Sequence, residues 1–329
     1  MNSRKNFSEE NIKSRPQRNK TRPRTKTTPT YQDLISGIVI TVDRGRFTVA
    51  LEAHDYQNTF AIKARALGRK GVVVGDRVGL TGVNLERPTD LARIVEIYQR
   101  KNVLRKSADD SESTEKILVT NASQIGIVVS IANPEPQLRF IDRALMAALD
   151  ADATPILIIT KTDLADPTWL IDLYKSFKIK ILTLNKNSPL DELGQLLLDK
   201  TTVLIGSSGV GKSSLVNRLV TSAHRSTGEV SELTGKGKHT STSAYALSYA
   251  PNSWIIDTPG LRSFGLAHLP IETALASMQD LNNLATSCPK ACSHENPDCA
   301  IVKESLTDES VKNRLESLQR IITSIKSTY

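Results

Sequence analysis

The pattern of hydrophobic and polar positions changes character along the 329 residues of the chain. Residues 36–100 contain short alternating runs separated by glycines, namely "GIVITV", "RFTVAL", "FAIKARA", "VVVGDRVGL" and "ARIVEIY". A period of two with turn residues every ~8–12 positions predicts the strands of a small β-barrel or sandwich. Because this segment is basic, and OB-like barrels often bind oligonucleotides, we expect an OB-like β-barrel over residues 36–106. A fold alone does not establish binding.

After residue 117 the pattern becomes an alternation of apolar strands and amphipathic helices. The predicted strands are "QIGIVVSI", "PILIIT", "KILTL", "TVLIG", "AYALSY" and "SWIIDT", and the predicted helices are "LRFIDRALMAALDA", "WLIDLYKSFK", "PLDELGQLLL" and "KSSLVNRLV". This order predicts an α/β sheet with helical crossovers and an active site at the carboxyl ends of its strands. The polar stretch "RKNVLRKSADDSESTEK" is interpreted as the linker that closes the barrel domain.

Composition narrows the class of protein. Hydrophobic residues make up 39% and charged residues 24%, which is typical of a globular soluble domain. No apolar run approaches the ~20 residues of a membrane helix, and the N-terminal "MNSRKNFSEENIK" lacks the apolar core of a secretory signal. We therefore expect a cytoplasmic protein without membrane contact.

The net charge of +8 is unevenly distributed. Residues 1–30 carry nine Lys and Arg against two Asp and Glu, and residues 31–106 carry thirteen against eight. The tail, assigned to residues 1–35, is rich in Pro, Thr and Arg and is expected to be disordered. Joined to a basic domain, it indicates a polyanionic partner such as nucleic acid, although a merely solvated tail is an equal alternative on the tail alone.

The stretch "GSSGVGKSS" fits a phosphate-binding loop, because it follows the apolar strand "TTVLI" directly and precedes a helix. Backbone N–H groups of a glycine-rich turn surround phosphates, Lys212 reaches the β and γ oxygens, and the Ser213 hydroxyl binds Mg²⁺. The predicted nucleotide-binding residues here are Gly206, Ser207, Ser208, Gly209, Val210, Gly211, Lys212, Ser213 and Ser214.

Two further motifs complete the predicted nucleotide site. In "WIIDTPG", Asp257 ends an apolar strand, where its carboxylate holds Mg²⁺ through water, and Gly260 offers its N–H to a γ-phosphate. In "IITKTDLAD", the segment of Thr160, Lys161, Thr162 and Asp163 matches a base-reading element. Its Asp accepts hydrogen bonds from both guanine donors and so selects GTP over ATP. Alternatively, "TKTD" is an ordinary helix entry.

All three cysteines of the chain lie in "CPKACSHENPDCA". Cys288, Cys292 and Cys299 bracket His294, and three thiolates with one imidazole form a closed tetrahedral set for one structural Zn²⁺. An odd number of thiols in a cytoplasmic chain argues against disulfides.

The motif order is base reader, phosphate loop and switch, which is a circular permutation of the usual GTPase order. In "TKTD", "GSSGVGKSS", "GKGKHTSTSA", "DTPGLRSFGL" and the Cys/His cluster, residues 36–329 resemble the RsgA/YjeQ family of circularly permuted GTPases. The Cys and His spacings, C-x3-C and H-x4-C, are each one residue shorter than the family pattern.

The resemblance implies a monomeric GTP hydrolase that acts in late maturation of the small ribosomal subunit. It implies binding to the subunit and its rRNA that depends on the GTP state, and hydrolysis that the subunit stimulates. Leu261 stands where many GTPases have a water-orienting Gln, and the family pattern assigns this role to His239. Either Thr240 or Thr242 supplies the switch hydroxyl that closes over Mg²⁺.

Two other functions remain open at this point. An ATP-dependent kinase uses a similar phosphate loop but needs no "TKTD", and a nucleotide-independent RNA-binding adaptor would carry a vestigial loop. The motifs divide the chain into a basic tail (1–35), an OB-like barrel (36–106), a circularly permuted GTPase domain (107–264) and a mainly helical zinc-binding domain (265–329).

Overall fold

The structure is a computed structural model that describes residues 31, 33–68, 71–87, 89–107, 115–227, 244–258, 271–276, 278–290 and 292–326. All helices and strands reported below lie within Asp33–Tyr329. His239, Thr240, Thr242, Gly260 and residues 1–30 of the predicted tail lie outside the described residues. Among the helices that are described, none combines the length and the apolar character needed to span a membrane.

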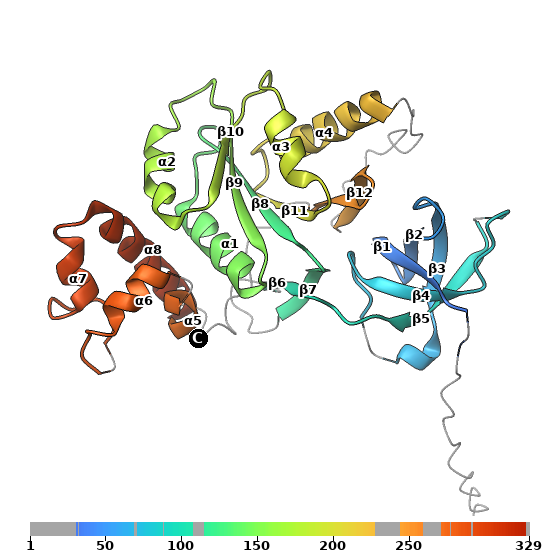
Figure 1. The fold of residues 1–329 in the computed structure, drawn as a ribbon, viewed down its shortest axis with the longest axis horizontal. Coiled ribbons are helices and arrows are strands. Elements are labelled where there is room, and N and C mark those ends of the chain that lie inside the picture. The colour runs from blue at the N-terminus through green and yellow to red at the C-terminus, as the bar shows by residue number, and fades with distance from the viewer. Residues whose placement is uncertain are drawn as a thin grey trace, which may run out of the picture. The chain divides into compact units, whose positions relative to one another are not determined.

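Five strands form a closed barrel near the start of the described chain (Figure 1). They are β1 (Ile35–Asp43), β2 (Arg46–Leu51), β3 (Asn58–Lys63), β4 (Arg77–Thr81) and β5 (Leu91–Ile97). Their order is β1-β2-β3-β5-β4, and β4 pairs back with β1 to close the sheet. Val39, Val49, Leu80 and Ile94, all from the predicted alternating runs, are fully buried in the barrel core. The predicted OB-like barrel is confirmed.

Two of the predicted barrel strands are shorter than the sequence pattern indicated. The run "FAIKARA" leaves the sheet after Lys63 and continues as a 3-10 helix, Arg65–Leu67. The run "VVVGDRVGL" is a strand only in its second half, because Gly75 turns the chain with a φ of 89°. A Cβ on Gly75 would lie 2.2 Å from the Thr120 carbonyl oxygen, so glycine permits this close backbone approach.

The stretch interpreted as a linker, residues 100–116, instead contains one strand of a β-hairpin and the first two residues of the other. Strand β6 (Val103–Ser107) pairs antiparallel with β7 (Glu115–Thr120). Leu104 and Val119 bury their side chains in the main core, with 2% and 0% of their surface exposed. The linker interpretation was wrong for the strand residues within 100–116, because most of these residues are polar and the buried side chain of Leu104 was given no weight.

The central sheet follows the predicted α/β pattern. Its strands are β8 (Gln124–Ser130), β9 (Thr154–Thr160), β10 (Lys180–Thr183), β11 (Thr201–Ile205), β12 (Tyr245–Ala250) and β13 (Ser253–Asp257). The order is β10-β9-β8-β11-β13-β12, parallel throughout except for β12. All seven residues of β8 are buried, as expected for a parallel strand covered on both faces.

Helices cover both faces of this sheet. They are α1 (Leu138–Asp150), α2 (Thr168–Tyr174), α3 (Asp191–Leu197) and α4 (Lys212–Thr227), with a 3-10 turn at Lys175–Phe177. Residues of α1 and α2 belong to one buried cluster, on one face of the sheet. Residues of α3 and α4 belong to a second cluster, together with the strand side chains that point to the other face. A sheet covered on both faces in this way binds ligands at the carboxyl ends of its strands.

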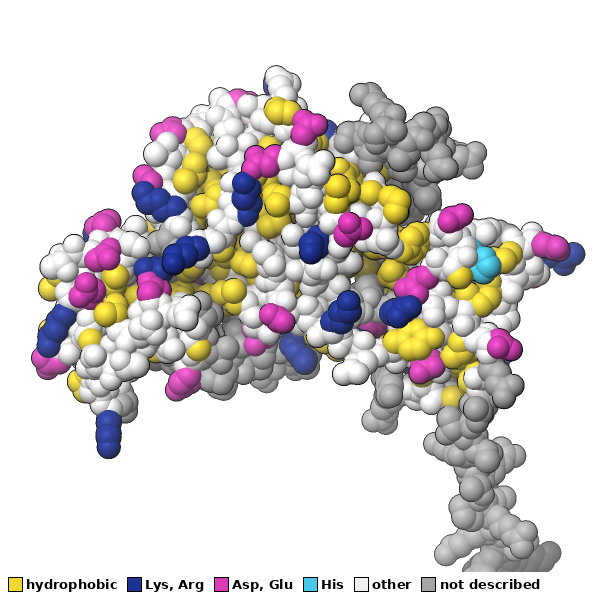
Figure 2. All heavy atoms as spheres, in the orientation of Figure 1, with side chains coloured by type: hydrophobic (Ala, Val, Ile, Leu, Met, Phe, Trp, Pro, Cys, Tyr) yellow, Lys and Arg dark blue, Asp and Glu magenta, His cyan; other side chains and the backbone are white. Residues whose placement is uncertain are grey.

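The C-terminal part is helical, as predicted, with α5 (Ile271–Ala276), α6 (Gln279–Ala285), α7 (Ala300–Ser305) and α8 (Glu309–Lys326). Leu318, Ile321 and Ile322 of α8 join the same buried cluster as α1. Figure 2 shows Lys and Arg side chains interspersed with Asp and Glu on the face in view, so the described surface there has no single basic patch.

Candidate functional site

The predicted phosphate loop connects β11 to α4. Gly209 and Gly211 have φ values of 84° and 91°, which L side chains rarely adopt. A Cβ on Gly206 would lie 2.4 Å from the Val128 carbonyl oxygen, so glycine is required where the loop leaves the sheet. Val210 is buried and anchors the loop in the core formed with α4. The glycine positions therefore follow from the backbone geometry of the loop.

Lys212 and Asp257 form a buried ion pair at the carboxyl ends of two neighbouring strands. Lys212 begins α4 and is 6% exposed, and Asp257 ends β13 and is 2% exposed. The Lys212 ammonium donates to the Asp257 carboxylate and, at 2.8 Å, to the carbonyl oxygen of Thr258. Ser213 and Ser214 follow in the first turn of α4 and are exposed.

The second oxygen of Asp257 has a partner that the sequence did not single out. The Tyr245 hydroxyl on β12 lies 3.1 Å from Asp257 Oδ2 and donates to it. Burial and the negative charge of Asp257 raise the pKa of Tyr245 to about 12, so the hydroxyl stays protonated near neutral pH. The carboxylate is therefore contacted on one side by an ammonium and on the other by a neutral phenol.

The predicted base reader directly follows β9 and is bonded to the phosphate loop. Thr160 is buried, and its hydroxyl lies 2.6 Å from the Val210 carbonyl oxygen and 3.1 Å from that of Val129. Lys161, with a φ of 58°, donates from its ammonium to the carbonyl oxygen of Asn133. Thr160 therefore braces the two loops through its hydroxyl, a role that an Asn amide also permits.

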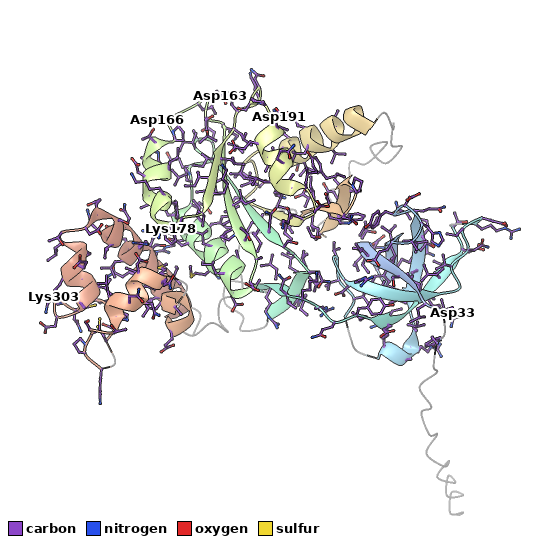
Figure 3. All side chains as sticks on the ribbon, in the orientation of Figure 1. Asp33, Asp163, Asp166, Lys178, Asp191 and Lys303 are labelled. Carbon is purple, nitrogen blue, oxygen red and sulfur yellow. The ribbon has the colours of Figure 1, made fainter. Side chains whose placement is uncertain are left out.

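Asp163 projects from the same loop. Its side chain is exposed, and Figure 3 shows it beyond the carboxyl ends of the strands, near the labelled Asp166. The Thr162 N–H donates to the Leu184 carbonyl oxygen at 3.3 Å, which ties this loop to the end of β10. An exposed carboxylate at this edge is free to accept hydrogen bonds from a ligand.

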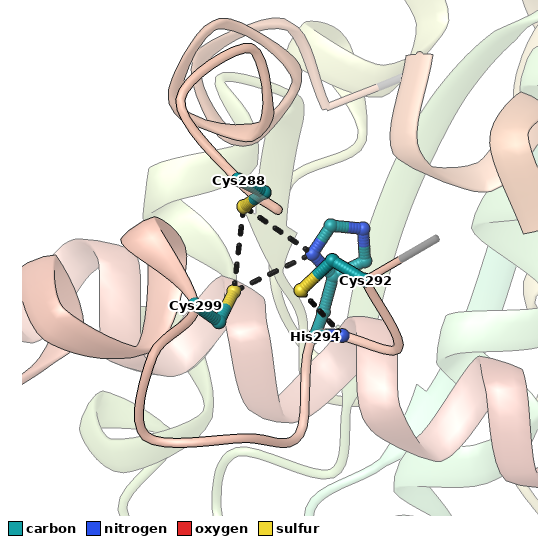
Figure 4. A group of neighbouring side chains, drawn as sticks. All are labelled: Cys288, Cys292, His294 and Cys299. Atoms are coloured by element: carbon teal, nitrogen blue, oxygen red, sulfur yellow. Dashed lines mark hydrogen bonds between the residues drawn. The ribbon is translucent and has the colours of Figure 1, made fainter. Parts of the chain in front are cut away.

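The four predicted metal ligands converge in the C-terminal part (Figure 4). Cys288 follows α6, Cys299 precedes α7, and Cys292 and His294 lie on the loop between them. Their ligand atoms all lie within 4.8 Å of one another. The convergence occurs although both spacings are one residue shorter than the family pattern.

The distances within this cluster fit a tetrahedral ion. The Cys288 and Cys299 sulfurs are 3.6 Å apart, and they lie 3.9 and 3.5 Å from His294 Nδ1. Metal–sulfur and metal–nitrogen bonds of ~2.3 and ~2.1 Å at tetrahedral angles give sulfur–sulfur and sulfur–nitrogen separations of about 3.8 and 3.6 Å. Burial lowers the pKa of His294, which favours the neutral imidazole that binds metal.

The surrounding chain supports the cluster. Burial tends to raise the pKa of the Cys288 thiol, but hydrogen bonds that include the backbone of Ala300 outweigh burial and lower it. Burial raises the pKa of Cys299 to about 11. Gln319 of α8 donates to the His294 carbonyl oxygen at 3.2 Å and holds the loop in place. The residues present fit one tetrahedral metal ion.

Comparison with known proteins identifies what the chain is similar to. Residues 97–267 match the family model described as RsgA GTPase. The small ribosomal subunit biogenesis GTPase RsgA of Borreliella afzelii is 32% identical over 263 residues, which cover 78% of this chain and 82% of that protein. The protein of the same name from Pseudomonas fluorescens is 32% identical over 269 residues, covering 78% of this chain and 76% of that protein.

Solved structures share the fold. YjeQ from Thermotoga maritima matches with a TM-score of 0.65 at 23% identity, covering 88% of this chain and 99% of that one. YloQ, described as a circularly permuted GTPase, matches with a TM-score of 0.66 at 23% identity, covering 90% of this chain and 96% of that one. Because YloQ is described as circularly permuted and this chain shares its fold, the circular permutation predicted from the motif order is confirmed.

Proposed function

Because the chain belongs to the RsgA GTPase family, we propose that it hydrolyses GTP to GDP and phosphate in late maturation of the small ribosomal subunit. The family match favours GTP hydrolysis over the ATP-dependent kinase and the nucleotide-independent adaptor. The contact that carries the site assignment is the hydrogen bond from Thr160 to the Val210 carbonyl oxygen. It joins a guanine-reading strand end to a phosphate loop, as one continuous nucleotide site requires.

Each motif then has a role in binding GTP. The backbone N–H groups of residues 206–211 and the ammonium of Lys212 bind the phosphates, and Ser214 extends this contact at the start of α4. Asp163 accepts from both guanine donors, and the stem of Lys161 lies along the base. Gly260 donates its N–H to the γ-phosphate, as its D-x-x-G position implies.

Ser213 and Asp257 fit a Mg²⁺ ion bound with the nucleotide. Ser213 offers an exposed hydroxyl in the first turn of α4, and Asp257 offers a buried carboxylate at a strand end. When bound, Mg²⁺ neutralises charge that develops on the phosphate oxygens. His239 orients the attacking water, and Thr240 or Thr242 closes the switch over the ion.

The metal of the C-terminal cluster is one structural Zn²⁺. Three thiolates and one imidazole are the ligands Zn²⁺ prefers, and a complete set of four leaves no position for catalytic water. The cluster ties α6, α7 and their connecting loop together, so zinc contributes folding free energy to this part of the chain.

The proposed binding partners, the small ribosomal subunit and its rRNA, are suggested by the family and by the positive charge of the N-terminal part of the chain. We propose that a monomer binds the small subunit and its rRNA in a manner set by the nucleotide, and that the subunit stimulates hydrolysis. The basic excess of residues 1–106 suits a phosphate backbone. In this proposal the tail is 1–35, the barrel 36–106, the GTPase domain 107–264 and the zinc domain 265–329, all in the cytoplasm.

Nucleotide competition tests the proposal. With Mg²⁺ present, GTP and GDP should displace a fluorescent GDP at least about 100-fold better than ATP, because a site built for specific hydrogen bonds rejects ligands that cannot make them. Asp163→Asn should weaken guanine binding and favour xanthine nucleotides. Asp166→Asn is the matched control, because this exposed carboxylate on the same loop contacts Thr168 instead. Equal competition by ATP would overturn the base assignment.

A further inference from the structure

The carboxylate of Asp257 is held from two sides by groups of different charge. Lys212 contacts Oδ1, and the Tyr245 hydroxyl contacts Oδ2 at 3.1 Å. An aspartate carboxylate has a broad, roughly two-fold rotational preference about its terminal bond, so its orientation depends on its hydrogen-bond partners. In a group only 2% exposed, water does not replace a missing partner easily.

Strand pairing accounts for the position of Tyr245. Strands β12 and β13 are antiparallel, and Tyr245 is paired directly with Asp257. Residues opposite each other on antiparallel strands project to the same face, so the phenol and the carboxylate are neighbours. An irregularity between Ser248 and Ala250 shifts the pairing by one residue, and without it Ala246 would face Asp257.

We propose that Tyr245 is a positioning residue that orients Asp257 toward the Mg²⁺ ion bound with the nucleotide. The inference rests on the proposed function, in which Lys212 binds phosphate and Asp257 serves the ion. Once the Lys212 ammonium turns to phosphate oxygens, the Tyr245 hydroxyl is the side-chain donor that remains on Asp257 among the described residues. It then fixes which carboxylate oxygen faces the ion.

Tyr245 also lies where the chain enters the sheet. It is the first residue of β12, directly after Ala244, and Ala244 follows the segment that contains His239. The Tyr245 hydroxyl, which contacts the carboxylate of Asp257, is thus on the strand that directly follows the predicted switch segment in the sequence. Removing a hydrogen-bond partner of a direct metal ligand typically changes metal affinity by ~10–100-fold, and we expect the low end of this range because Asp257 holds Mg²⁺ through water.

The test compares Tyr245→Phe with Tyr249→Phe in the full chain. Tyr249 lies on the same strand, but its hydroxyl faces α3 at Gly194, so its removal controls for loss of a phenol from β12. Dissociation of fluorescent GDP is measured while Mg²⁺ is titrated, and again in EDTA. We expect Tyr245→Phe to need about tenfold more Mg²⁺ for half-maximal slowing of dissociation, with rates in EDTA changed less than twofold. Tyr249→Phe should match the unmodified chain.

Asp257→Asn separates the inference from the function on which it rests. A shifted Mg²⁺ requirement in Asp257→Asn with none in Tyr245→Phe overturns the role of Tyr245 and leaves the metal assignment intact. No shift in either variant overturns the metal assignment of Asp257 itself. Faster dissociation in EDTA for Tyr245→Phe, with an unchanged Mg²⁺ midpoint, would make Tyr245 merely structural and also overturns the inference.

Discussion

Replacing Asp142 with alanine should destabilise the junction between the GTPase core and the C-terminal helices. Asp142 of α1 is 1% exposed. It accepts from Arg320 at 2.5 Å and from Ser317 at 2.6 Å, both on α8, and from the Tyr174 hydroxyl at 2.9 Å. Burial raises the pKa of Asp142, and the three donors, one of them cationic, oppose that rise. One carboxylate on α1 thus accepts hydrogen bonds from two other helices, α2 and α8.

The expected loss follows from the groups left without an acceptor. The Arg320 side chain is 23% exposed, and removing one partner of such a buried pair costs about 3–5 kcal/mol. Each stranded hydroxyl adds about 1–3 kcal/mol, although Tyr174 keeps a 3.4 Å contact with the Leu138 carbonyl oxygen. Because members of one network are not additive, we expect roughly 4–6 kcal/mol in total.

Thermal and urea unfolding measure this loss. A change of that size lowers Tm by roughly 10–20 °C, given ~2–4 °C per kcal/mol for large domains. Asp172→Ala is the matched control, because Asp172 pairs with Lys175 at the surface, with side chains 54% and 66% exposed. Such exposed pairs contribute about 0–1 kcal/mol. GDP binding below the transition should persist in both variants.

A double-mutant cycle sharpens the test. Removing Asp142 and Arg320 together should cost clearly less than the sum of the two single changes, since neither charge is then buried alone. Additive losses, or a loss below about 1 kcal/mol for Asp142→Ala, would refute the reasoning. Asp142→Asn should lose less stability than Asp142→Ala but more than the Asp172→Ala control, because its amide oxygen still accepts from the two hydroxyls.

Three further outcomes are expected. Thr160→Val keeps the side-chain shape but leaves the Val210 carbonyl oxygen without this donor, so GDP affinity measured by fluorescence should fall about 5–150-fold, as a loss of ~1–3 kcal/mol implies. Elemental analysis should find about one Zn per chain, and Cys292→Ser should release it and lower the unfolding temperature of the C-terminal part while GTP binding persists. Small ribosomal subunits should raise GTP turnover at least about tenfold, raised salt should erode this, and His239→Ala should bind GTP normally but lose the stimulated rate. Stimulation that survives in His239→Ala would remove that residue from catalysis.

Features that depend on near neighbours could be predicted from the sequence. Glycines of the phosphate loop are needed where φ is positive, and the apolar run of residues 125–129 in β8 is needed where both faces of a strand are covered. Ligand chemistry is likewise local, because Cys and His types within twelve residues already indicate a soft metal site. These predictions required no knowledge of distant contacts.

Other features depend on which segments meet. Strand β6 lies in a stretch that is polar on average, and only its pairing with β7 and the packing of Leu104 in the main core identify it. The contact between Asp142 and Arg320 joins residues 178 positions apart, and no spacing rule reaches that far. Such contacts arise from the docking of whole elements.

The nucleotide site likewise has some features that are local in the sequence and others that depend on contacts between distant segments. The residue types and the order of the motifs could be predicted without the fold, because each motif is a short stretch whose chemistry depends on its own side chains and backbone. Tertiary structure decided that the Thr160 hydroxyl reaches the phosphate loop and that Tyr245, rather than Ala246, faces Asp257. The physical reason is that both depend on strand pairing, and a one-residue irregularity in a hairpin moves every later side chain to a different partner.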